Sequence, residues 1–206
     1  MPDLIRCFVA VELPAEVKAR IERQTARLRS GSADVKWVPP ENLHLTIKFL
    51  GGVPQAEAPG LADILREAVR GTEPFEVEVA GAGVFPGVKS PRVFWIGFKD
   101  PESRLSGLAR RVEDALEQAG YPREQRSFTP HLTLGRFREA RGRSRETGPG
   151  KGEAMAGAKR LAEELATLEG VVFGKIRLEN ISLMRSELSP GGARYSRLAS
   201  IRFGGL

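Results

Sequence analysis

The 206-residue sequence contains one cysteine and only two histidines. Cys7 cannot form an internal disulfide, and because it lies in an apolar run we expect it to be a small buried hydrophobic residue rather than a nucleophile. Two histidines and one remote cysteine are too few for the usual zinc ligand sets, and nothing in the sequence indicates a histidine–carboxylate magnesium site. We therefore predict no metal and no other cofactor.

Long hydrophobic runs are also missing. No apolar stretch approaches the roughly 20 residues needed to cross a bilayer, and the first residues lack the pattern of a signal peptide. No glycine-rich motif that would cradle a nucleotide phosphate is present either. We predict a cytoplasmic protein that forms a single domain over residues 1–206 and acts as a monomer.

The charge is positive and unevenly distributed. The formal net charge is +6 and the isoelectric point is about 9.8, which suits an anionic partner such as RNA. Between residues 136 and 160 there are eight basic and three acidic residues, so this stretch alone supplies five of the six excess charges. Residues 138–155 are rich in glycine and arginine and predict a flexible basic loop, which is either an RNA-binding arm or a solvated surface segment.

Periodicity predicts a mixture of helices and strands. Helical spacing indicates helices over residues 14–29, 56–69, 101–119 and 158–168. Residues rich in β-branched and aromatic side chains indicate strands over 7–11, 43–50, 75–80, 92–98, 128–137, 171–173, 175–185 and 195–203. This order predicts an α+β fold with antiparallel sheets rather than a doubly wound parallel sheet.

Both histidines lie in the same local sequence, His-Leu-Thr followed by a hydrophobic residue. The segments begin at His44 and His131. With seven threonines in the chain, a threonine two places after a given histidine arises by chance about once in 30 times, and twice together on the order of once in a thousand. The repetition indicates an internal duplication or one shared role.

In a strand, residues two apart share a face, so each segment presents one imidazole and one hydroxyl to the same surface. Two such strands side by side would bring together an imidazole that removes a proton from water, an imidazolium that protonates a departing ribose oxygen, and hydroxyl donors for phosphate oxygens. The alternative, two structural histidines, does not explain why both occur in matched surroundings. The symmetry of the motifs leaves open which histidine is the acid.

At these residues the sequence resembles the two-histidine phosphoesterase superfamily, and within it the bacterial and archaeal RNA 2',3'-cyclic phosphodiesterases, also called 2'-5' RNA ligases. The resemblance extends over nearly the whole chain. It is carried by residues 6–14, by 37–46 and 48–51, by 91–95 and 130–136, and by 185–188 and 192–195. It implies two pseudo-symmetric α+β lobes, with antiparallel sheets flanked by helices, around a central cleft that carries the two motifs.

The same resemblance implies residue roles. His44 would protonate the leaving 3'-oxygen, His131 would activate water, and Thr46 and Thr133 would donate to phosphate oxygens, leaving a 2'-phosphate. Arg136 matches a basic residue that contacts the phosphate in this family. Strict alternation puts Arg136 on the face opposite His131, so this role requires a bulge or a strand end after Gly135.

Three further residues are candidates for substrate binding. Trp37 and Tyr195 could stack on a base or could be ordinary core aromatics. Lys48 shares the face of His44 if the period of two holds, and would add positive charge there.

We therefore predict hydrolysis of 2',3'-cyclic phosphate ends of RNA, including tRNA fragments, with reverse 2'-5' ligation as a secondary reaction. Two other functions remain open. A small nucleotide-derived cyclic phosphate would use the same histidines with less need for a basic surface. A non-catalytic RNA-binding module would need no histidine.

Overall fold

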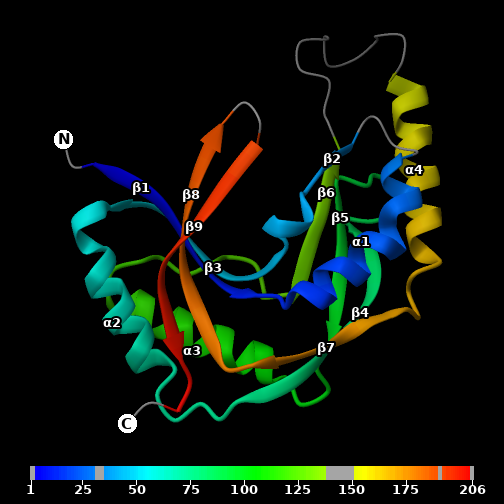
Figure 1. Ribbon diagram of the computed structural model, residues 1–206. Helices are drawn as coiled ribbons and strands as arrows, with labels where there is room; N and C mark the ends of the chain where they lie inside the picture. Colours follow the sequence, from blue (N-terminus) through cyan, green and yellow to red (C-terminus); the bar gives the residue numbers. More distant parts are fainter. Residues whose placement is uncertain (1–2, 31–34, 138–150, 190–191, 205–206) are drawn as a thin grey trace.

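The computed structural model describes residues 3–30, 35–137, 151–189 and 192–204, and shows helices packed on a strongly curved sheet (Figure 1). The α-helices are α1 (Ala15–Ser30), α2 (Ala58–Ala68), α3 (Arg104–Gln118) and α4 (Lys151–Ala166), and short 3-10 helices are η1 (Pro40–Asn42) and η2 (Gln55–Glu57). The strands are β1 (Leu4–Glu12), β2 (Val35–Trp37), β3 (His44–Pro54), β4 (Phe75–Phe85), β5 (Val93–Lys99), β6 (His131–Phe137), β7 (Val172–Leu178), β8 (Asn180–Ser189) and β9 (Gly192–Arg202).

Within the described residues the nine strands form one sheet in the order β7-β4-β5-β6-β3-β1-β8-β9, with β2 attached to β6. Every recorded pairing is antiparallel. The predicted α+β class with antiparallel pairing is therefore confirmed.

The sheet divides into two lobes that meet between β3 and β6. We call β3, β1, β8 and β9 the first lobe and β6, β5, β4 and β7 the second lobe. Helices α2 and α3 pack on the first lobe, whereas α1 and α4 pack on the second (Figure 1). Helix α1 follows β1 of the first lobe but packs on the second, and α3 follows β5 of the second lobe but packs on the first, which ties the two lobes together.

One face of the sheet holds the main hydrophobic core. The helical faces predicted from periodicity are buried there, including Val17 and Ile21 of α1 and Leu108 and Val112 of α3. Burial of these apolar side chains is the main force that holds the helices on the sheet.

Two predicted boundaries shift. Helix α3 begins at Arg104 rather than Pro101, because the Asp100 carboxylate accepts hydrogen bonds from the backbone N–H groups of Arg104 (3.0 Å) and Leu105 (2.7 Å) and so caps the first turn. Strand β6 begins at His131 rather than Phe128.

The single strand predicted over 175–185 is wrong, because the chain breaks at Glu179 into two strands with different partners. Strand β7 pairs with β4 in the second lobe, whereas β8 pairs with β1 and β9 in the first lobe. A continuous β-rich sequence carries no sign that the chain crosses from one lobe to the other.

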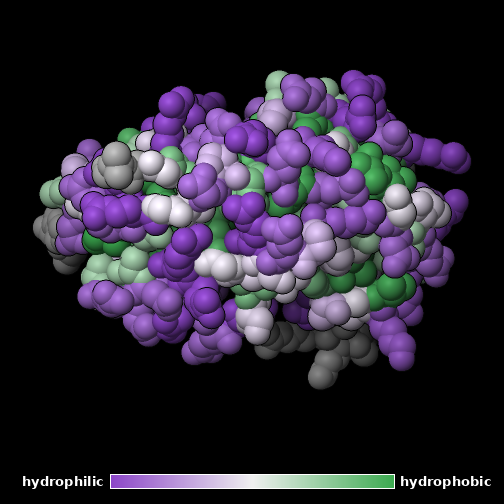
Figure 2. Space-filling view, turned by 90° about the horizontal axis from the view of Figure 1, so that it is seen from below, coloured by the Kyte–Doolittle hydropathy of each residue, from purple (hydrophilic) through white to green (hydrophobic). Residues whose placement is uncertain are grey.

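The predicted basic loop over 138–155 is wrong for residues 151–155. Its last five residues belong to α4, which begins at Lys151, while 138–150 lie outside the described residues. Among the helices that the structure describes, none combines the length and apolar character needed to cross a membrane. Figure 2 shows one face of the molecule, where hydrophilic side chains predominate and hydrophobic ones lie in separate patches.

Candidate active site

The two histidine motifs lie on adjacent strands at the junction of the lobes. The recorded pair between β3 and β6 joins Leu45 to Leu132, the residues that follow the two histidines. Since equivalent positions of the two motifs pair with each other in antiparallel strands, a pseudo-two-fold axis passes through this pair. In that register His44 lies across from Thr133 and Thr46 across from His131.

The alternation within each motif is as predicted. Leu45 and Leu132 are fully buried in the core. The two histidines and the two threonines are partly exposed, on the opposite face of the sheet. The motifs therefore present two imidazoles and two hydroxyls to one surface, which we call the cleft face.

Each histidine ring is held by a backbone carbonyl two residues earlier. The Nδ1 atom of His44 lies 2.7 Å from the Asn42 carbonyl oxygen, and Nδ1 of His131 lies 2.7 Å from that of Thr129. A carbonyl oxygen only accepts, so Nδ1 carries the proton in both rings. The Nε2 atom of each ring is thereby left as the position that gains or loses a proton.

Aromatic rings support both imidazoles. His44 lies 4.8 Å from the ring of Phe8 and 5.1 Å from that of Tyr195, between ring centroids. His131 lies 5.2 Å from the ring of Phe85, edge to face. These contacts restrict the rings to one orientation, which a proton-transferring group requires.

A bulge in β3 changes the face of the residues that follow the first motif. Val9 pairs with Lys48 and Ala10 with Thr46, so Ile47 is an extra residue in β3. Such an insertion shifts the alternation of side chains by one position. Ile47 and Lys48 are consequently both buried.

The second motif carries the same bulge. Phe94 pairs with Gly135 and Trp95 with Thr133, so Leu134 is the extra residue. Because of this bulge, the exposed side chain of Arg136 lies on the same face of the sheet as His131. The predicted requirement for a bulge is met, one residue earlier than expected.

The prediction for Lys48 is wrong, for the same reason. Its side chain is 1% exposed and forms an ion pair with Glu113 of α3 (2.5 Å) and a hydrogen bond to the Pro122 carbonyl (2.8 Å). Lys48 therefore joins β3 to the helix layer under the first lobe and does not reach the cleft face.

Trp37 also lies in the core rather than on the cleft face. Its ring packs 6.0 Å from that of Phe94, and the Arg29 guanidinium carbon lies 5.4 Å from its centroid. A Cβ at Gly135 would lie 2.9 Å from the Trp37 ring, so the glycine is needed for close packing of β2 on β6. The core alternative for Trp37 is the correct one, and stacking on a base is not supported.

Tyr195, in contrast, lies where the prediction needs it. Its ring packs on His44, and the backbone of β9 is held nearby because the Asn42 side-chain amide donates to the Ala193 carbonyl (3.0 Å). Burial raises the pKa of the Tyr195 hydroxyl, and the positive charge of Arg136 lowers it. Arg136 of the second lobe therefore lies close enough to Tyr195 of the first lobe to act on its hydroxyl electrostatically.

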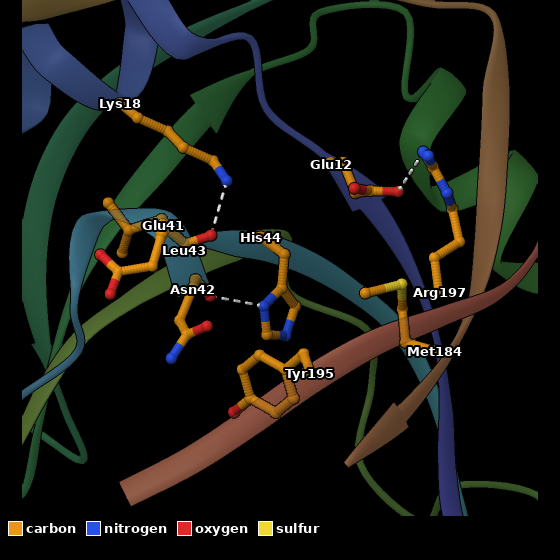
Figure 3. A pocket seen from close by; sticks show the side chains of 9 residues that line it. All are labelled: Glu12, Lys18, Glu41, Asn42, Leu43, His44, Met184, Tyr195 and Arg197. Carbon is orange, nitrogen blue, oxygen red and sulfur yellow. Dashed lines mark hydrogen bonds and ion pairs between the residues drawn. The ribbon is translucent and has the colours of Figure 1, made fainter. Parts of the chain in front are cut away.

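A pocket of about 190 Å³ opens beside His44 (Figure 3). It is lined by Glu12, Lys18, Glu41, Asn42, Leu43, His44, Met184, Tyr195 and Arg197. His131, Thr133 and Arg136 do not line it, so it extends the site on the first-lobe side only. Burial lowers the pKa of His44; the hydrogen bond to Asn42 raises it, Lys18 lowers it and Glu12 raises it.

A family model described as LigT-like phosphoesterase matches residues 11–95 and again residues 96–195. Each match contains one of the two histidine motifs, and together they cover most of the chain. The chain belongs to the LigT-like phosphoesterase family. The two successive matches agree with the internal duplication that the repeated motif indicates.

Relatives and solved structures agree with this membership. A curated protein of Methanothermobacter thermautotrophicus named RNA 2',3'-cyclic phosphodiesterase is 36% identical over 198 residues, covering 96% of this chain and 98% of the relative. A crystal structure of a protein from Thermus thermophilus has a TM-score of 0.75 at 28% identity, over 98% of this chain and 99% of that chain. Escherichia coli LigT complexed with 3'-AMP has a TM-score of 0.72 at 27% identity, with the same coverage.

One residue of this LigT-like site escaped the sequence analysis. Phe49 is 60% exposed although it is a large aromatic, and its ring lies 6.1 Å from that of Phe8, which in turn contacts His44. The bulge at Ile47 turns it onto the cleft face, five residues after its histidine, as Arg136 is after His131. No signal within the strand itself could have found it, because the bulge is defined only by the register with β1.

Proposed function

We propose that this chain hydrolyses terminal 2',3'-cyclic phosphates of RNA, using His44 and His131 as acid and base. The observation that carries the proposal is the pair of imidazoles at the lobe junction, each with Nδ1 tied to a carbonyl and Nε2 left to exchange a proton. The activity named for the Methanothermobacter relative, which matches over nearly its full length, supports the choice of substrate.

In the proposed reaction the cyclic phosphate binds between the two histidines. Nε2 of His131 removes a proton from water, whose oxygen attacks phosphorus from the side opposite the bond that breaks. The bond from phosphorus to the 3'-oxygen breaks, and protonated Nε2 of His44 gives its proton to that oxygen. One water is consumed, and the product ends in a 2'-phosphate and a 3'-hydroxyl.

Other groups on the cleft face suit a phosphate and a base. The hydroxyls of Thr46 and Thr133 donate to the phosphate oxygens on which negative charge increases during the reaction, and Arg136 adds a cation. Phe49 offers an exposed aromatic face on which a nucleobase can stack. Tyr195 forms part of the wall beside His44.

The decisive experiment is turnover, in EDTA, of an RNA oligonucleotide ending in a 2',3'-cyclic phosphate, with resolution of 2'- and 3'-phosphate products. We expect a 2'-phosphate product, and a loss of about 10²–10⁴-fold for His44→Ala and for His131→Ala. Arg66→Ala, which removes an exposed cation of α2 that pairs with Asp63 in the helix layer, is the control and should leave turnover unchanged.

Other outcomes contradict the proposal in different ways. Faster turnover of a mononucleotide cyclic phosphate than of the oligonucleotide would favour a small-molecule substrate. RNA binding without any turnover would favour a binding module. Activity that survives in both histidine variants would remove the two-histidine mechanism. Reverse 2'-5' ligation, action on tRNA fragments, independence of metal, the monomeric state and the cytoplasmic location remain predictions.

A further inference from the structure

The two histidines differ in the residue that pairs with each of them on the outer neighbouring strand. In β1, the partner of His44 is Glu12. In β5, the pseudo-symmetric partner of His131 is Gly97. Directly opposed residues of antiparallel strands project their side chains to the same face. A carboxylate therefore occupies this position beside His44, whereas the equivalent position beside His131 has no side chain.

The Glu12 carboxylate is held in place by two donors. The hydroxyl of Ser182, a fully buried residue of β8, donates to its Oε1 atom at 2.6 Å, and the Arg197 guanidinium donates to the same atom at 3.2 Å. Both the carboxylate and His44 line the pocket beside the cleft (Figure 3). The negative charge therefore has a defined position near the ring.

We propose that Glu12 is a positioning residue whose carboxylate favours the imidazolium form of His44 and so supports His44 in the role of general acid. The inference rests on the proposed function, since an acid is needed only if a ribose oxygen departs. A general acid must hold its proton before the reaction, and a neighbouring carboxylate favours the protonated ring.

Several other charges face His44 and must be distinguished from Glu12. Lys18 of α1 donates to the Glu41 carbonyl (2.7 Å), and its charge disfavours the imidazolium. Glu41 of η1 lines the same pocket, and Arg197 of β9 partly neutralises Glu12. Burial also favours the neutral ring, so the carboxylate of Glu12 offsets burial and Lys18 rather than acting alone.

The chain has only two histidines, so each ring can be titrated by NMR and assigned with the single histidine variants. Glu12→Gln keeps an acceptor for Ser182 but removes the charge. We expect it to lower the pKa of His44 by about 0.5–1 unit and to leave the titration of His131 unchanged. Glu12→Asp should largely restore the wild-type value, whereas Glu41→Gln should have a smaller effect.

Kinetics then test the role in the reaction. In the pH profile of kcat, the alkaline limb reports the acid of the enzyme–substrate complex. We expect Glu12→Gln to move this limb to lower pH and to leave the acidic limb in place. A movement of the acidic limb instead would overturn the assignment of His44 as the acid.

The titration needs no turnover, so it also separates this inference from the proposed function. The role of Glu12 would be overturned, even in an active enzyme, if Glu12→Gln left the titration of His44 unchanged or shifted both histidines equally. It would also be overturned if Glu41→Gln shifted the titration of His44 as much as Glu12→Gln does. A wild type without turnover, by contrast, would overturn the proposed function and with it the assignment of an acid, whatever the titration gives.

Discussion

The two halves of the site share a backbone and differ in what surrounds it. Each half has a histidine tied to the carbonyl two residues before it, a threonine two residues after it, and a bulge at the next position. Beyond the bulge, a buried lysine in one half corresponds to a glycine in the other, and Phe49 corresponds to Arg136. The duplicated motif preserves proton-transfer geometry, while the neighbouring positions have become different enough to give the cleft two distinct ends.

The largest effect concerns stability, at the positions directly after the bulges. Lys48→Met leaves the Glu113 carboxylate, which is 15% exposed, without its cation, and we expect a loss of about 3 kcal/mol in the free energy of unfolding. Gly135→Ala puts a Cβ 2.7 Å from Val35 and should cost about 1–3 kcal/mol through overpacking. Urea unfolding measures both, and a neutral Lys48→Met would mean that the ion pair contributes little.

The two threonines should behave alike if both hydroxyls bind phosphate oxygens. Thr46→Val and Thr133→Val preserve shape and remove one donor, so we expect each to lower kcat by about 10²–10³-fold. The control is Thr167→Val, a threonine after α4 whose hydroxyl donates to the Glu164 carbonyl. A loss in only one of the two variants would show that the pseudo-symmetry does not extend to phosphate binding.

Phe49 and Arg136 occupy equivalent positions but should act through different forces. Phe49→Ala should weaken RNA binding by about 1–3 kcal/mol, with an unchanged salt dependence, because stacking carries no net charge. Arg136→Gln should weaken binding and also reduce the slope of log K against log salt by about 1. Val172→Ala, on the distant edge strand β7, is the control. Equal salt slopes for the two variants would contradict this division.

The smallest effect is the pH dependence of stability due to His44. Its pKa lies below the usual 6.5, with burial as the largest cause, so below pH 6.5 the unfolded chain binds more protons than the folded one. Stability from this group is complete above pH 6.5 and decreases as the pH falls toward the folded pKa. Relative to His44→Asn, the wild type should lose about 1 kcal/mol or less between pH 7.5 and 5.

Urea unfolding at several pH values measures this difference, with His131→Asn studied in parallel. A wild type and a His44→Asn variant that respond identically to pH would contradict burial of the imidazole as the main influence on its pKa.

The histidines, the threonines and the helical faces could be predicted because they depend on short-range order. An apolar stripe at helical spacing and a repeated His-Leu-Thr segment are complete within a few residues, and their burial or exposure follows from the local period. Arg136 was assigned to the phosphate by resemblance, and the bulge that this role requires was anticipated as well.

Lys48 was placed wrongly on the substrate side, and Phe49 was missed, because a bulge changes the face of every residue after it. For Trp37 the sequence left both alternatives open, and the packing of β2 on β6 decided between them. A bulge exists only relative to the partner strand, so no period within one strand can reveal it. The break at Glu179 escaped for the same reason, since it separates two partners rather than two kinds of sequence.

The sequence by itself determined which groups are available for chemistry, an α+β architecture, and a repeated unit with one imidazole and one hydroxyl on a shared face. Only the tertiary structure decided that Leu45 meets Leu132, that Phe49 and Arg136 turn to the cleft, and that Glu12 stands beside one histidine but not the other. Register between strands is set by packing across the whole sheet, and that is information that no single segment contains.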